Sequence, residues 1–223
     1  MKKEINEAFK DSLPIMAGYI VLGSGFGIVA NSYGFNMLVP ILMSLFIYAG
    51  SMEYLALSLI SVGTSLISAF ITTIVVNLRH LFYGISMLEK YNDLNKNKIY
   101  TIFALTDETF SVVTSKKMDG LDKSYYFYIS LFNQIYWVAG TILGYLIGSV
   151  LPFSTDGVDF SMTALFICVV INQWEECENH LPALFGFAFS IICLIIFGSS
   201  NFLIPSILLI CVALILCRGK LDE

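Results

Sequence analysis

Three short polar stretches interrupt apolar segments in the first half of this chain, and one contains an arginine and a histidine. It reads Asn77-Leu78-Arg79-His80-Leu81-Phe82-Tyr83-Gly84. At about 3.6 residues per turn, Asn77 and His80 share one helix face, and Arg79 and Tyr83 share an adjacent face. The planar guanidinium of Arg79 suits a carboxylate, and histidine titrates near physiological pH. For Arg79 alone there is an alternative to a functional role: its long side chain could extend from the helix end so that the charge reaches the bilayer surface.

The second stretch places two adjacent carboxylates among hydroxyl side chains, in the order Leu105-Thr106-Asp107-Glu108-Thr109-Phe110. Neighbouring residues lie about 100° apart around a helix, so Asp107 and Glu108 cannot share a face. One carboxylate can line a cavity while the other caps a helix or pairs with Arg79. Carboxylates and threonines also stabilise the N-terminus of a broken half-helix. A solvated turn between two helices is the alternative.

The third stretch is Tyr48-Ala49-Gly50-Ser51-Met52-Glu53-Tyr54. A helix can unwind or pack tightly at Ala49-Gly50-Ser51, because these side chains are small. Glu53 follows one turn later within an apolar run. It could carry a proton or act as a neutral hydrogen-bonding group, and structural pairing with another side chain is the alternative.

The segments around these stretches are too apolar for a water-soluble protein. Hydrophobic residues make up 57% of the 223 residues and charged residues 13%, whereas a typical soluble domain has about 45–50% and about 25%. The composition therefore predicts an integral membrane protein in contact with the lipid bilayer. Ionisable groups are costly in lipid and usually face a bundle interior or a water-filled cavity. The three polar stretches are thus expected to line a transport pathway confined to the first half of the chain.

The sequence predicts an all-α, polytopic transmembrane helix bundle. A spanning helix needs about 20 mostly apolar residues, and the fourth and sixth of eight hydrophobic elements are shorter than that. The prediction is a single transmembrane domain over residues 1–223, with seven or eight membrane elements and re-entrant or broken helices among them. The elements are Leu13–Ala30, Met37–Ile60, Ser65–Leu88, Ile99–Ser115, Tyr125–Leu151, Phe160–Asn172, Leu181–Phe197 and Phe202–Cys217.

Basic residues near the ends of these elements predict the orientation. Lysines or arginines flank the first element, occupy the 116–123 loop and follow the last element, so eight crossings would leave both termini in the cytoplasm. The loop over residues 89–98 disagrees, because its three lysines would then lie outside. Seven crossings, or a re-entrant or broken helix near this loop, would remove the conflict.

Glycines four residues apart occur in the first and fifth elements. They are Gly23 and Gly27, then Gly140, Gly144 and Gly148, and such spacing lets membrane helices pack closely. In both places a glycine-spaced helix is followed by a polar loop and an apolar helix. This order predicts two repeated halves, 12–115 and 124–217, as in many secondary transporters; coincidence in a glycine-rich sequence is the alternative.

Other functional classes find no support in the sequence. Basic clusters are short, which argues against nucleic-acid binding, and the five cysteines form no CxxC pair, which argues against a metal site or a disulfide framework. The acidic segment over residues 173–180 is interpreted as a solvated loop. No nucleotide, zinc-protease or nucleophile motif occurs. We therefore expect no cofactor and no metal.

In its polar stretches the chain resembles the AzlC family, the large subunit of a two-component branched-chain amino acid exporter. The stretches NLRHLFYG at 77–84, LTDETF at 105–110, AGS at 49–51 and LPIMAGYIVLGSGFG at 13–27 match the family. The resemblance runs from about residue 12 to about residue 217. It implies export of leucine, isoleucine, valine and analogues such as azaleucine across the cell membrane. It also implies a small AzlD-like membrane subunit and drive by the proton-motive force. The family has glutamine where this chain has Glu53, which leaves substrate range and proton coupling open.

A zwitterionic amino acid with an aliphatic tail needs a cation, an anion and an apolar pocket. We expect Arg79 to bind the carboxylate, and Asp107 or Glu108 to bind the ammonium group. The alternatives are a membrane-embedded enzyme that uses Asp107 or Glu108 with His80, and a scaffold without transport activity; a homo-oligomer is compatible with each. The predicted substrate-binding residues are Asn77, Arg79, Tyr83, Thr106, Asp107 and Glu108, and the proton-coupling candidates are Glu53 and His80.

Overall fold

The computed structural model describes residues 2–92, 94, 97–118, 120–150, 167, 170–171, 174–175, 179–198 and 202–217. Every secondary-structure element in these ranges is a helix, which confirms the predicted all-α class. The chain divides into two compact units, Met1–Thr163 and Ala164–Glu223.

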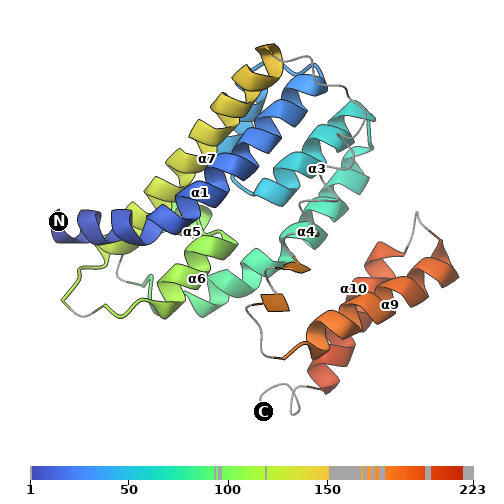
Figure 1. Cartoon of the computed structure of the whole chain (residues 1–223). Coiled ribbons are helices and arrows are strands. Elements are labelled where there is room, and N and C mark those ends of the chain that lie inside the picture. Colours follow the sequence, from blue (N-terminus) through green and yellow to red (C-terminus); the bar gives the residue numbers. More distant parts are fainter. Residues whose placement is uncertain are drawn as a thin grey trace. The chain divides into compact units, whose positions relative to one another are not determined.

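Helices α1 (Lys2–Ser32) and α7 (Ser124–Val150) form the most extensive helix contact of the first unit and lie side by side in Figure 1. Glycine makes this close approach possible. A Cβ atom added to Gly27 would overlap the carbonyl oxygen of Thr141, and one added to Gly144 would overlap the backbone of Ser24. The close packing expected from the glycine spacing is therefore present between these two helices.

The predicted single helix over Met37–Ile60 is wrong, because the structure has α2 (Leu38–Phe46) and α3 (Gly50–Ser61) in its place. At the interruption Tyr48 has a φ of 47°, a left-handed conformation that no helix can continue. Gly50 then opens α3 against the indole of Trp137, and a Cβ atom there would come within 2.8 Å of the ring. The break thus falls at the Ala49-Gly50-Ser51 stretch, where unwinding was one of the two expectations.

The fourth predicted element, Ile99–Ser115, is also divided, into α5 (Lys98–Phe103) and α6 (Asp107–Ser115). Thr106 caps α6, since its hydroxyl accepts a hydrogen bond from the Thr109 N–H at 3.3 Å. Behind α6, a buried apolar cluster holds it against α7 and against the turn after α4. The cluster contains Ala8, Met87, Tyr91, Leu94, Leu105, Val113, Tyr125, Tyr126 and Ile129.

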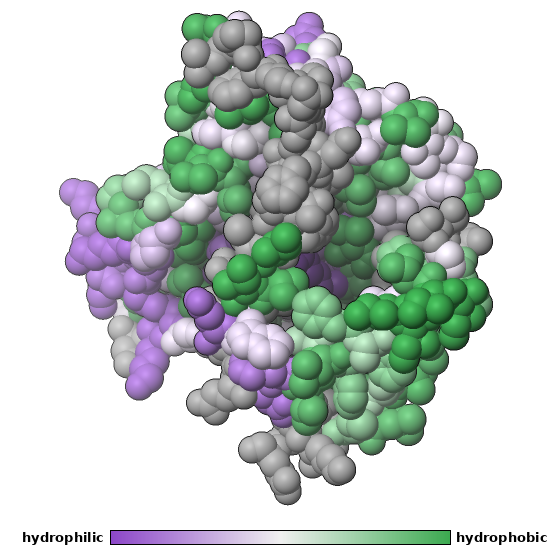
Figure 2. All heavy atoms as spheres, turned by 45° about the vertical axis from the view of Figure 1, so that its right-hand side comes forward, coloured by the Kyte–Doolittle hydropathy of each residue, from purple (hydrophilic) through white to green (hydrophobic). Residues whose placement is uncertain are grey.

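Helix α4 (Leu66–Ser86) agrees with the predicted element Ser65–Leu88 and has no buried residue within the first unit. Its outward side chains are large and apolar; Leu66, for example, is 88% exposed. Figure 2 shows many hydrophobic side chains on the visible surface, with the largest hydrophilic group at the left and lower left of the view. Such apolar surface suits contact with lipid rather than with water.

Among the described residues, two helices are long and apolar enough to cross a membrane, α1 and α4. Helix α7 has 27 residues and no charged side chain, but its tyrosines and its Asn133-Gln134 pair leave it without a stretch of spanning length as apolar as those in α1 and α4. The interrupted helices are individually too short. Length and composition alone therefore do not fix the number of crossings, which stays a prediction.

In the second unit, α9 (Leu181–Phe197) and α10 (Leu203–Leu216) pack against each other. Their bounds agree with the predicted elements Leu181–Phe197 and Phe202–Cys217. The predicted element Phe160–Asn172 lies almost entirely outside the described residues, as does half of the acidic segment over residues 173–180. The repeat of two halves therefore also stays a prediction.

Lys116 ties the N-terminal part of α1 to the end of α6. Its ammonium lies 2.6 Å from Asp11 and 3.3 Å from Glu7. The hydrogen bond to Asp11 raises the pKa of Lys116 above its usual value, so the stabilisation is complete below that value and is lost only as the pH rises through the raised pKa.

We expect Lys116→Gln to lower the free energy of unfolding by about 0.2–1 kcal/mol, because the ion pair is partly exposed to solvent. The loss should be the same at about pH 6 and about pH 9, since lysine stays protonated over this range. Detergent-solubilised protein melted at both values checks this. A loss confined to one of the two pH values would contradict it.

Candidate functional site

Arg79 on α4 joins the first turns of two interrupted helices. Its Nη1 lies 2.6 Å from Oδ2 of Asp107, and its Nη2 donates a hydrogen bond of 3.1 Å to Oγ of Ser51. The side chains of Arg79 and Asp107 are 31% and 30% exposed. Arg79 therefore binds residues of α3 and α6. Its side chain does not simply extend toward a bilayer surface, which was the alternative interpretation.

Both partners of Arg79 stand at helix N-termini. Ser51 is the second residue of α3, and Asp107 is the first residue of α6. The first backbone N–H groups of a helix have no partner within it, and the helix dipole adds positive potential there. A negatively charged group beside these turns is stabilised by Arg79 and by the helix ends together.

Asp107 and Glu108 diverge, as the sequence predicted for adjacent residues on a helix. Asp107 faces Arg79, whereas Glu108 accepts a hydrogen bond of 2.6 Å from the Tyr19 hydroxyl on α1. The same hydroxyl lies 2.6 Å from Oγ1 of Thr106, which caps α6. Glu108 is exposed as a residue, although its hydrogen bond to Tyr19 is partly buried.

Replacing Tyr19 with phenylalanine removes one hydrogen bond to a charged group and one to a hydroxyl. We expect the free energy of unfolding to fall by about 1–3 kcal/mol, because the buried Thr106 loses a partner and Glu108 loses a donor. Thermal melting in detergent measures this loss, with Tyr128→Phe as a control at a tyrosine on the partly exposed side of α7. Equal melting of the Tyr19 variant and the wild type would contradict it.

The remaining residues of the predicted histidine stretch make contacts of a different kind. Tyr83 stacks on Phe110 of α6, with ring centroids 4.4 Å apart, and the ring of His80 meets Tyr83 edge-on at 5.9 Å. Asn77 donates to the carbonyl of Thr73 at 3.0 Å, within its own helix. Tyr83 therefore joins Arg79 at α6, whereas the amide nitrogen of Asn77 turns back onto α4.

Glu53 occupies a separate, fully buried position behind the α2–α3 interruption. Its Oε1 accepts from the Ala49 N–H at 3.1 Å, and its Oε2 accepts from Trp137 Nε1 at 3.2 Å and contacts Oγ of Ser44 at 3.0 Å. Glu53 and Ser51 share the first turn of α3, so this carboxyl group is linked to Arg79 only through that turn.

Polar residues of α1 and α7 complete the site, which corrects the expectation that polar chemistry is confined to the first half of the chain. Asn133 donates to Oγ1 of Thr109 at 2.9 Å, and Trp137 and Thr141 belong to the surroundings of Glu53. The sequence feature that could have identified these α7 residues is their spacing. Residues 133, 137 and 141 recur every four positions and share one face of an uncharged helix.

Five buried polar atoms of the polar stretches and of Asn133, which contacts Thr109, have no hydrogen-bond partner among the described residues. They are the Tyr48 hydroxyl, Asn77 Oδ1, Arg79 Nε, Asp107 Oδ1 and Asn133 Oδ1. Buried polar groups in proteins are nearly always paired. Arg79 Nε and Asp107 Oδ1 belong to the ion pair itself, and these two atoms favour a site whose polar partners arrive with a ligand.

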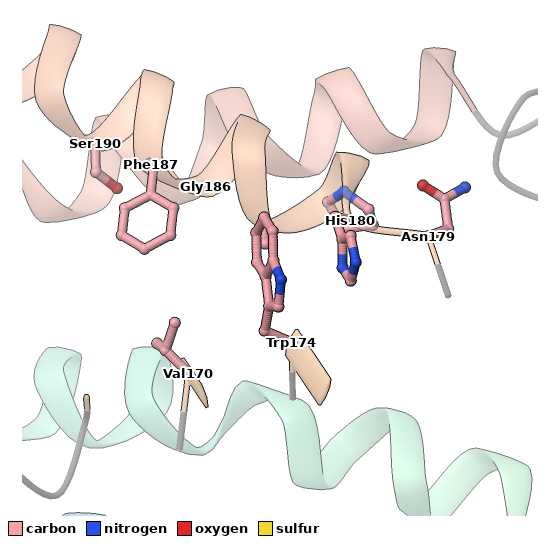
Figure 3. A pocket seen from close by; sticks show the side chains of 9 residues that line it. Val170, Trp174, Asn179, His180, Gly186, Phe187 and Ser190 are labelled. Carbon is pink, nitrogen blue, oxygen red and sulfur yellow. The ribbon is translucent and has the colours of Figure 1, made fainter. Parts of the chain in front are cut away.

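The second unit has a cavity of its own, of about 510 Å³, beside the N-terminus of α9 (Figure 3). Trp174 and His180 stack there with ring centroids 4.1 Å apart and nearly parallel planes, and Phe187 and Ser190 of α9 also line the cavity. No sequence-predicted site residue lies in it. Over the ranges that the structure describes, no group of His, Cys, Asp and Glu could hold a metal ion.

Comparison with known sequences decides the family. The sequence model of the AzlC protein family matches residues 14–151, which include both interrupted helices and Arg79. The chain belongs to the AzlC family. The branched-chain amino acid transport protein AzlC of Bacillus subtilis (strain 168) is 43% identical over 218 residues, covering 97% of this chain and 86% of that protein.

Two further proteins that are similar to this chain are described as membrane proteins. One from Haemophilus influenzae is 42% identical, covering 96% of this chain and 89% of its own length. The inner membrane protein YgaZ of Escherichia coli K12 is 31% identical, covering 78% of this chain and 74% of its own length. No solved structure matches significantly. These descriptions agree with the apolar composition and the long apolar helices of this chain.

Proposed function

We propose that this chain is a secondary transporter that exports branched-chain amino acids across the cell membrane. One observation carries the proposal: Arg79 bridges the first turns of two interrupted helices, with Asp107 as its ion-pair partner. Substrate sites at the ends of discontinuous helices are typical of secondary transporters. The name of the Bacillus subtilis relative, a branched-chain amino acid transport protein, supports the same substrate class.

An amino acid carries both charges of the Arg79–Asp107 pair on one molecule. Its carboxylate can replace Asp107 at Arg79, and its ammonium can then bind Asp107 or the exposed Glu108. One ion pair is exchanged for two, so neither protein charge is left unpaired in this partly buried site. The Tyr83–Phe110 stack offers an apolar surface for the aliphatic tail.

The contacts of Arg79 also suggest a way in which transport is gated. While Arg79 holds Asp107 and Ser51, it ties α4 to α3 and α6. Substrate that takes over the contacts of Arg79 and Asp107 releases this tie between the helices. Part of the free energy of substrate binding then drives a change between two arrangements of these helices, as alternating access requires.

The rest of the proposal follows the family resemblance and the charge pattern. We propose a multi-pass protein with both termini in the cytoplasm, driven by the proton-motive force and assembled with a small AzlD-like membrane subunit. Its site acts on a small amino acid. Lysines flanking the first and last elements support the orientation.

Expression of the chain in cells, with and without an AzlD-like subunit, tests the proposal. We expect lower intracellular leucine and greater azaleucine resistance when the chain is active. Leucine recovered outside the cells should be chemically unchanged, which would argue against an enzyme. Unchanged leucine and unchanged resistance in every combination would contradict the proposed function, and Arg79→Gln serves as the inactive control.

A further inference from the structure

A buried chain of hydroxyl groups leads away from Glu53. Oε2 of Glu53 lies 3.0 Å from Oγ of Ser44 on α2, and Ser44 Oγ lies 2.9 Å from Oγ1 of Thr141 on α7. Thr141 in turn donates to the backbone carbonyl of Trp137 at 3.0 Å. Glu53, Ser44 and Thr141 have no measurable exposure.

The number of hydrogen atoms in this chain depends on the protonation of Glu53. Three contacts need three hydrogens, but Ser44 and Thr141 supply only one each. If Thr141 donates to the Trp137 carbonyl, Ser44 must donate to Thr141. Glu53 must then donate to Ser44, which requires a protonated carboxyl group. With Glu53 ionised, Ser44 donates to Glu53 and Thr141 donates to Ser44, and the carbonyl contact is given up.

The other donors to Glu53 do not distinguish the two states. The Ala49 N–H and Trp137 Nε1 donate to the carboxyl oxygens whether or not a proton is present. Within the described part of the chain, no cation pairs with Glu53. Of the charged or titratable groups on the surrounding elements, Arg79 and Asp107 pair with each other, Tyr19 donates to Glu108, and Tyr54 donates to the Leu22 carbonyl. The remaining two are Tyr48, whose hydroxyl carries no positive charge, and His80, whose ring contacts Tyr83. A fully buried carboxyl group without a cation is stabilised in its neutral form.

We propose that Glu53 is a proton-binding site, and that Ser44 and Thr141 satisfy both of its states by reversing the direction of their hydrogen bonds. When Glu53 releases its proton, the O–H bond of the carboxyl group breaks and the proton passes to water. The two hydroxyls then rotate toward the carboxylate. Because only rotations about C–O bonds are needed, the surrounding helices can keep their packing.

The position of Glu53 links this proton to the substrate site. Glu53 binds the Ala49 N–H at the α2–α3 interruption, and two residues before it Ser51 binds Arg79. A hydrogen bond to an ionised acceptor is about twice as strong as a neutral one, so proton release tightens the first turn of α3. The link to transport rests on the proposed function, whereas the proton site itself does not.

Infrared difference spectra of the purified protein at low and high pH test the site directly. We expect the carbonyl band of a protonated carboxyl group to disappear at high pH in the wild type and to be missing in Glu53→Gln. Ser44→Ala should shift the frequency of this band, because the carboxyl proton loses its acceptor. Glu89→Gln, which removes an exposed carboxyl group after α4 and outside the hydroxyl chain, should leave it unchanged. Identical spectra of the wild type and Glu53→Gln would overturn the proposal.

Transport by proteoliposomes tests the coupling. In the wild type, a gradient of one pH unit should support up to about tenfold accumulation of labelled leucine for each proton moved. Glu53→Gln should lose this accumulation and keep leucine exchange in the absence of a gradient, while Glu89→Gln, at an exposed carboxyl group after α4, should keep both. A wild type without any leucine exchange would contradict the proposed function. Accumulation by Glu53→Gln equal to that of the wild type would contradict the coupling alone.

Discussion

Replacing Gly144 with alanine will separate α1 from α7 and leave little folded protein. The added Cβ atom would overlap the carbonyl oxygen, Cα and carbonyl carbon of Ser24. A backbone atom cannot move aside as a side chain can, so the whole helix must shift. Overpacking of a core by one methylene typically lowers the free energy of unfolding by about 1–3 kcal/mol. Because the overlap here is with backbone, we expect a loss at or above the upper end of this range. Gly27→Ala should have the same effect from the other side, where the Cβ atom meets the backbone of Thr141 and Tyr145.

Gly18→Ala is the matched control on α1, because no atom lies within 4 Å of a Cβ atom at that position. Alanine favours a helix over glycine by about 1 kcal/mol, so Gly18→Ala should melt at the wild-type temperature or above it. Size-exclusion chromatography of heated, detergent-solubilised protein compares the three variants. A monodisperse Gly144→Ala protein that melts with the wild type would contradict the packing described here.

Removing either charge of the Arg79–Asp107 pair will abolish most transport with little effect on folding. Each variant, Arg79→Gln or Asp107→Asn, loses charge-assisted hydrogen bonds to the substrate, which contribute about 1.5–3 kcal/mol. We therefore expect leucine transport to fall by about 10- to 100-fold. The pair is nearly one-third exposed, so the free energy of unfolding should change by no more than about 1 kcal/mol.

The double variant Arg79→Gln/Asp107→Asn separates a binding role from a structural one. It leaves no unpaired charge, so a purely structural ion pair would allow transport to recover in the double variant. A substrate site needs both charges, and the double variant should be as inactive as either single variant. Arg79→Lys should also stay well below the wild type, since one ammonium cannot reproduce the planar fork that reaches both Ser51 and Asp107. Recovery of transport in the double variant would show that Arg79 and Asp107 only hold the helices together.

Much of this arrangement follows from the sequence through local physical rules. Apolar length predicted α4, α9 and α10 to within two residues at each end. Threonine before two carboxylates predicted the start of α6, because a Thr106 cap and negative charge both favour a helix N-terminus. The divergence of Asp107 and Glu108 follows from the helical repeat alone.

Other features depend on contacts between distant parts of the chain, which local rules do not contain. The left-handed Tyr48 is held between α2 and α3, although nothing in its own sequence requires that conformation. The partners of Glu53 come from α2 and α7, and the Tyr19 contact to Glu108 joins residues 89 positions apart. Helix α7 was itself predicted, as the element Tyr125–Leu151. Its polar residues Asn133, Trp137 and Thr141 were not predicted as part of the site, because none of them is charged and so none marks a large cost in lipid.

Leucine counterflow is the most direct test of the claim that Arg79 and Asp107 form an amino-acid site. Proteoliposomes are loaded with unlabelled leucine, with the chain reconstituted with and without an AzlD-like subunit, and uptake of labelled leucine is followed without an ion gradient. We predict rapid uptake by the wild type in at least one of the two preparations, and uptake at the level of empty liposomes by Arg79→Gln/Asp107→Asn. Counterflow by this double variant at the wild-type rate would contradict the account.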